Sequence, residues 1–129
     1  MSSFTKLLTV TKIGTRSWRV ERSFTYLIDF DDTLESVEVP KGFVTDFASV
    51  PRVFWVLLPP DGRYTQAAVL HDFLYFTQQY TRRQADRIFL EAMAVLGVWW
   101  IRRRTMWLAV RACGWYGWNK RKNEIMDMR

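Results

Sequence analysis

Short stretches of β-branched and aromatic residues, with polar residues between them, occupy the first third of the chain. This pattern is typical of β-strands bounded by turns. The stretches cover residues 7–13, 18–21, 24–28 and 35–39. Gly14 and a polar turn at residues 29–33 separate them, and Pro40 ends the last one because proline cannot donate a ladder hydrogen bond. The pattern predicts an antiparallel β-meander.

From residue 50 onward the apolar positions recur at the helical spacing of three and four residues. Helices are expected over residues 51–58, 64–78, 81–96 and 101–118. The third has the clearest boundaries, because Thr81 and Gln84 have the spacing of a capping box and Gly97 is a natural end. Its core-facing stripe consists of Ala85, Ile88, Phe89, Ala92, Met93 and Leu96.

The expected fold class is α+β, with an N-terminal antiparallel β-meander followed by three to four helices. A length of 129 residues is enough for a single domain, residues 1–129, with one hydrophobic core. We expect residues 1–49 to be mainly β and residues 50–118 mainly α. Residues 119–129 are expected to form a basic tail that can be flexible.

The cysteine and histidine counts restrict the chemistry. Cys113 is the only cysteine, so an internal disulfide is excluded and a reducing compartment is favoured. His71 is the only histidine, which excludes zinc sites built on several imidazoles. The first residues lack the basic and then apolar pattern of a signal peptide, and the longest uncharged run, residues 92–101, is about half of what spans a bilayer. We therefore expect neither a cleaved signal nor a transmembrane helix.

The net charge of +6 lies entirely in the last quarter of the chain, where residues 98–129 hold eight Lys/Arg and two Asp/Glu. Tryptophans alternate with these cations, a combination that suits a membrane interface or a protein interface. The candidate surface residues are Trp99, Trp100, Arg102, Arg103, Arg104, Trp107 and Arg111. The alternatives are tryptophans packed in the core and a solvated basic tail. Nucleic-acid binding is not favoured, because no recognition motif is present.

One constellation could carry catalysis. His71 and Tyr75 lie four residues apart and share a helix face, and Asp86 can reach them if the two central helices form a hairpin. A carboxylate that orients a neutral imidazole makes it a better base toward water. Asp72 points about 100° away from His71 and could hold a hard cation such as Ca²⁺. The pattern indicates a water-activating hydrolase.

Residues 67–89 resemble phospholipase A2, and the parvoviral form more closely than the secreted one. The similarity rests on Ala67-Ala68, His71-Asp72, Tyr75 and Ala85-Asp86-x-x-Phe89. It implies that His71 is the general base, Asp72 a Ca²⁺ ligand, Asp86 the carboxylate behind the imidazole and Tyr75 its support. The family's glycine-rich calcium loop is not found here, since residues 57–63 contain one glycine and two prolines. Asp46 or Asp61 would have to supply the missing ligand.

Residues 37–117 resemble small uncharacterised proteins of tailed bacteriophages and prophages that are grouped as a domain of unknown function. The similarity rests on Val39-Pro40-Lys41-Gly42-Phe43-Val44-Thr45-Asp46-Phe47-Ala48-Ser49-Val50-Pro51-Arg52, on the His71 motif and on a late Gly114. It implies a phage origin, action in the host bacterial cytoplasm and an association with the virion. It implies no activity.

Two functional hypotheses follow. The first is a phage-encoded hydrolase of the phospholipase A2 type, assisted by a divalent cation and acting at a phospholipid membrane surface. The second is a non-catalytic virion, tail or assembly protein that contacts other virion proteins. In the second hypothesis, His71, Asp72, Tyr75 and Asp86 form a structural cluster that fixes helix register. Asp46 and Ser49 then act only in a turn and a helix cap.

Overall fold

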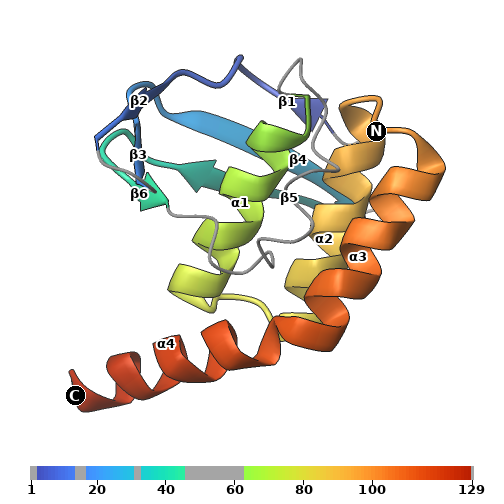
Figure 1. Cartoon of the computed structure of the whole chain (residues 1–129). Coiled ribbons are helices and arrows are strands. Elements are labelled where there is room, and N and C mark those ends of the chain that lie inside the picture. The colour runs from blue at the N-terminus through green and yellow to red at the C-terminus, as the bar shows by residue number, and fades with distance from the viewer. Residues whose placement is uncertain (1–2, 14–16, 31–32, 46–62, 129) are drawn as a thin grey trace. The chain divides into compact units, whose positions relative to one another are not determined.

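The computed structural model describes residues 3–13, 17–30, 33–45 and 63–128 (Figure 1). The chain forms two compact units, residues 1–47 and residues 48–129. The first unit contains the β-strands and the second the α-helices. This confirms the expected α+β class. The expected helix at residues 51–58 lies outside the described residues.

The strands form two antiparallel sheets of three strands each. In the first sheet, β4 (Phe24–Phe30) lies between β1 (Ser3–Phe4) and β5 (Thr33–Val39). In the second sheet, β3 (Trp18–Val20) lies between β2 (Val10–Lys12) and β6 (Val44–Thr45). A continuous meander would pair only consecutive strands, whereas β1 pairs with β4 and β3 with β6. The chain therefore passes from the first sheet to the second after β1, returns to the first after β3 and passes to the second again after β5.

The first sheet shows the two-residue alternation expected of a half-buried strand. Phe24, Tyr26 and Ile28 are buried, whereas Leu27 between them is exposed. Phe24 lies opposite Val39 and Tyr26 opposite Val37, so apolar side chains meet across β4 and β5. β5 ends at the residue before Pro40, as predicted.

The two central helices agree closely with the prediction. α1 (Arg63–Thr77) is followed by α2 (Arg82–Val95), which starts with the complete Thr81–Gln84 capping box. Five of the six stripe residues on α2 are fully buried: Ala85, Ile88, Phe89, Ala92 and Met93. Gly97 has a φ of 81°, and the amide of Val98 donates to the Met93 carbonyl, which closes the helix end.

The basic segment forms two helices where one was expected over residues 101–118. α3 (Trp100–Cys113) and α4 (Trp115–Asp127) meet at Gly114, and α4 leaves in a different direction (Figure 1). α4 therefore includes most of the expected basic tail. Its contacts are with the end of α1: Gln78 Nε2 donates to the Trp118 carbonyl at 2.9 Å, and Arg121 Nε donates to the Phe76 carbonyl at 2.8 Å.

α1 is buried on nearly every side, since Ala67 through His71 are all at most 1% exposed. No helix in the described part of the chain combines the length and the apolar character needed to cross a bilayer.

Candidate functional site

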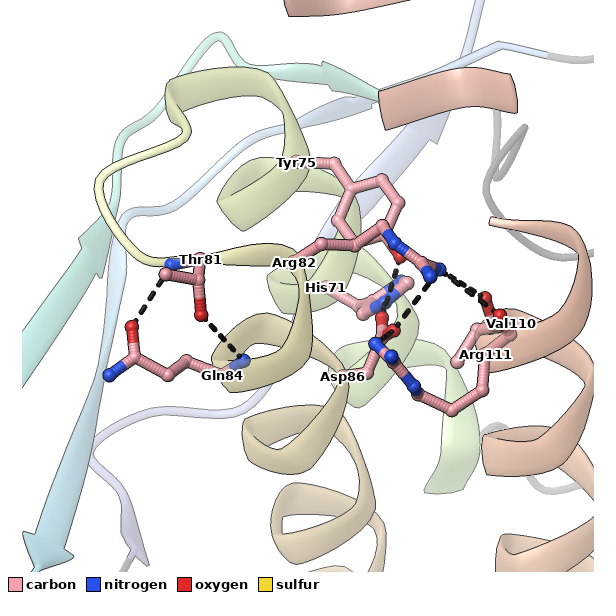
Figure 2. Close-up of polar contacts among 8 residues, drawn as sticks. All are labelled: His71, Tyr75, Thr81, Arg82, Gln84, Asp86, Val110 and Arg111. Atoms are coloured by element: carbon pink, nitrogen blue, oxygen red, sulfur yellow. Dashed lines mark hydrogen bonds and ion pairs between the residues drawn. The ribbon is translucent and has the colours of Figure 1, made fainter. Parts of the chain in front are cut away.

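Three helices bring five polar side chains together inside the helical unit (Figure 2). His71 and Tyr75 lie one turn apart on α1, and Asp86 faces them from α2. His71 Nε2 is 2.7 Å from Asp86 Oδ1, and the Tyr75 hydroxyl donates to the same oxygen at 2.6 Å. The predicted helical hairpin and the predicted proximity of these three residues are therefore confirmed.

Two arginines surround the other oxygen of Asp86. Arg111 Nη1 on α3 donates to Asp86 Oδ2 at 2.8 Å, and Arg82 Nη1 lies 3.6 Å from the same atom. Arg82 also donates to the backbone carbonyls of Val110 and Arg111, both at 3.2 Å. Asp86 is thus the point at which side chains from α1, α2 and α3 meet. We refer to His71, Tyr75, Arg82, Asp86 and Arg111 as the Asp86 cluster.

The Asp86 carboxylate is held in its ionised form. Burial acts to raise the pKa of Asp86, but hydrogen bonds from His71, Tyr75 and Arg111 outweigh it and lower the pKa below its usual range. An ionised carboxylate only accepts hydrogen bonds. His71 Nε2 must therefore carry the proton that it shares with Asp86.

The His71 ring is expected to be neutral at pH 7. Burial lowers the pKa of His71, although the hydrogen bond and the charge of Asp86 act in the opposite direction. With the proton on Nε2, the neutral ring has its basic lone pair on Nδ1. This tautomer is the one required of a base that is oriented by a carboxylate.

The ring lies in an aromatic environment. Its centroid is 4.4 Å from that of Tyr75 and 4.5 Å from that of Phe89. Trp118 on α4 packs edge-on against Tyr75, with the ring centroids 5.1 Å apart. Neither His71 nor Asp86 has any exposed surface, and burial together with Asp86 raises the pKa of Tyr75. Water can reach Nδ1 only if this environment opens.

The burial of His71 predicts a pH dependence of stability. The unfolded chain binds a proton near the ordinary histidine pKa of about 6.5, whereas the folded chain does so only at lower pH. The unfolded state therefore binds more protons as the pH falls from 7 to 5, and the free energy of unfolding should decrease over this range. Urea unfolding at several pH values measures it.

His71→Gln is the control for this prediction, because the chain has no other histidine. The variant should lose the decrease between pH 7 and 5. It should retain the acid-side loss below about pH 4, where the unfolded chain takes up a proton at the ordinary aspartate pKa while folded Asp86, whose pKa is lowered, stays ionised. A wild-type stability that is constant from pH 7 to 5 would contradict a buried neutral imidazole.

Gly114 leaves room for the Tyr75 hydroxyl. A Cβ at this position would stand 2.6 Å from that hydroxyl and would also overlap the Val110 carbonyl. Gly114→Ala should therefore displace Tyr75 from Asp86 and lower the free energy of unfolding by about 1–3 kcal/mol. Gly117→Ala is the matched control. Its Cβ meets nothing within 4 Å, and it should stabilise α4 by about 0.5–1 kcal/mol in urea unfolding.

Of the two predicted metal ligands, Asp72 and Asp46, only Asp72 lies among the described residues. Asp72 is half-buried on α1, and Asp46 lies outside the described residues. Among the residues that the structure describes, no three His, Cys, Asp or Glu side chains could share an ion.

The predicted basic surface is divided by the structure. Trp99, Trp100, Arg102 and Arg104 are exposed, whereas Arg103, Trp107 and Arg111 are half-buried. Arg103 Nη1 donates to the Val98 carbonyl at 3.0 Å, and the Arg111 guanidinium binds Asp86. Arg111 was expected on the surface, and its packing against α2 could not be read from its neighbours. The Arg82–Asp86 spacing of four residues was a visible signal for the second arginine.

A family model described as "Protein of unknown function (DUF1353)" matches residues 18–110. The chain is also similar to an uncharacterised protein, y4jT, of Sinorhizobium fredii (strain NBRC 101917 / NGR234), with 35% identity over 78 residues. This match covers 59% of the chain and 23% of the relative, so the chain spans about a quarter of that protein. No solved structure matches. Because the family model covers well over half of the chain, including His71, Tyr75 and Asp86, the chain belongs to the DUF1353 family.

Proposed function

We propose that this chain is an ester hydrolase of the phospholipase A2 type in which His71 activates water. The observation that carries the proposal is the shared oxygen of Asp86, which lies 2.7 Å from His71 Nε2 and 2.6 Å from the Tyr75 hydroxyl. A carboxylate held by a phenol and an arginine fixes both the tautomer and the orientation of the imidazole.

The proposed reaction uses only these side chains. Nδ1 of His71 removes a proton from water as the water oxygen attacks the ester carbonyl carbon. When the carbon–oxygen bond of the tetrahedral intermediate breaks, the same nitrogen returns the proton to the departing alcohol oxygen. Asp86 stays ionised throughout and stabilises the imidazolium, while Tyr75 and Arg111 hold Asp86 in place. Asp72 is the candidate ligand for an assisting cation, and no step above depends on one.

A second candidate is a non-catalytic virion or assembly protein, and the complete burial of His71 favours it. In this case the Asp86 cluster fixes the register of α1, α2 and α3, because a buried polar group is satisfied in only one arrangement of the helices. Both candidates include the proposed origin in a tailed phage or prophage, which is supported by the sequence motif at residues 39–52 and His71.

The deciding experiment measures fatty-acid release from phosphatidylglycerol-containing vesicles and from a soluble short-chain ester. We expect wild-type activity on both, and arms with Ca²⁺ and with EDTA test the cation. A wild-type protein that is inert in every arm would end the hydrolase proposal. Recovery of the chain in purified virions, together with that inactivity, would establish the second candidate.

A further inference from the structure

The N-terminal end of α3 presents an unusual outer surface. Trp99 and Trp100 are 63% and 55% exposed and form an edge-on pair with ring centroids 6.4 Å apart. Ile101, next to them, is 45% exposed. Solvent-facing helix positions are normally polar, because burying large apolar groups stabilises the fold and exposing them does not. Three consecutive large apolar side chains therefore indicate a contact surface.

The charge around this pair has a single sign. α3 contains four arginines and no acidic residue. Arg103 is bound to the Val98 carbonyl and Arg111 to Asp86. Arg102 and Arg104 are exposed, and neither has a hydrogen bond or an ion pair within the described parts of the chain. Two available guanidinium groups beside exposed indoles complement an anionic partner.

One stripe of α3 connects this surface with the Asp86 cluster. Trp100, Arg104, Trp107 and Arg111 are spaced by four, three and four residues and so lie on one face of the helix. Trp100 and Arg104 are exposed, whereas Trp107 and Arg111 are half-buried, and Arg111 binds Asp86. The distance along the axis from Trp100 to Arg111 is about 16 Å, since a helix rises 1.5 Å per residue.

We propose that Trp99, Trp100, Ile101, Arg102 and Arg104 dock the chain on an anionic phospholipid surface. The indoles insert at headgroup depth and the guanidinium groups bind lipid phosphates. A lipid bilayer is favoured over a nucleic acid because two indoles and an isoleucine gain most from an apolar boundary. The choice of a lipid partner rests on the proposed function, whereas the exposed residues and their charge do not.

The test is flotation of the full chain with vesicles of phosphatidylcholine alone and of phosphatidylcholine with phosphatidylglycerol. We expect binding only to the anionic vesicles and a loss of binding at high salt. Arg102→Gln with Arg104→Gln should weaken binding about 30-fold. Trp99→Ala with Trp100→Ala should weaken it about tenfold or more. Neither pair of changes removes a side-chain cap, because α3 has none.

Matched controls lie on α4. Lys120→Gln with Lys122→Gln removes the same charge from exposed positions, and Trp115→Ala with Tyr116→Ala removes an exposed edge-on aromatic pair. Both control variants should bind within about threefold of wild type if the docking surface is on α3. Equal losses in test and control variants, or no binding to anionic vesicles, would overturn the proposal. Binding to DNA in place of vesicles would overturn it as well.

Hydrolysis assays separate this proposal from the proposed function. Docking variants should lose activity on vesicles and keep it on the soluble ester, whereas His71→Gln should lose both. Vesicle binding without any hydrolysis would support the docking surface and contradict the proposed hydrolase function. Hydrolysis of the soluble ester without vesicle binding would do the reverse.

Discussion

Replacing His71 with glutamine is expected to lower the rate of ester hydrolysis by about 10²–10⁴-fold, the usual contribution of a general base. The glutamine amide can still donate to Asp86, so the contact between α1 and α2 remains possible. It cannot accept a proton at neutral pH, so water activation is lost. The measurement is the steady-state rate on the soluble ester, which does not depend on membrane docking.

Tyr75→Phe is the control for the His71 result. It removes the hydroxyl that donates to Asp86 but keeps the imidazole, so it should cost about tenfold or less in rate. Circular dichroism must show both variants folded. Wild-type rates in His71→Gln would exclude His71 as the base and would favour the structural role of the Asp86 cluster.

Replacing Asp86 with alanine is expected to lower the free energy of unfolding by about 3–5 kcal/mol, the usual cost of breaking a buried ion pair from one side. The change leaves the Tyr75 hydroxyl and His71 Nε2 without their acceptor in a buried site. It also leaves two arginines facing each other without a carboxylate between them. A protein of this size has about 5–15 kcal/mol of stability, so the loss should be large in urea unfolding followed at 222 nm.

Asp127→Ala is the matched control for Asp86→Ala, because Asp127 is an exposed carboxylate near the end of α4. It should change the free energy of unfolding by no more than about 0.5 kcal/mol. The loss of unfolding free energy in Asp86→Asn should lie between those of Asp86→Ala and Asp127→Ala. The amide oxygen can replace Oδ1 as an acceptor, but the amide nitrogen would face the donor group of Arg111. A stability of Asp86→Ala equal to that of Asp127→Ala would mean that the cluster does not hold the helices together.

Local signals in the sequence were sufficient for the central helices. The capping box at Thr81, the apolar stripe on α2 and the stop at Gly97 depend only on residues a few positions apart. The spacing of His71 and Tyr75 is local too. Asp86 required one further assumption, that consecutive helices connected by a short loop pack antiparallel, and this assumption was correct.

The features that were missed depend on contacts between distant residues. β1 and β6 contain two residues each and exist only through pairing with β4 and β3, so no pattern of their own could reveal them. Arg111 lies 25 residues after Asp86 and resembles the other arginines of α3 in sequence. The break at Gly114 was read as a helix interior because the apolar spacing continues through it.

The cover over Tyr75 has a consequence for relatives of this chain. The match to the family model ends at residue 110, and Arg111, Gly114 and Trp118 contact the Asp86–Tyr75 pair from beyond it. A relative whose sequence diverges after that point must cover the corresponding tyrosine hydroxyl with a different segment or leave it exposed to solvent. Chimeras that exchange only residues 18–110 should therefore keep the contact between Tyr75 and Asp86 but lose the residues that cover it.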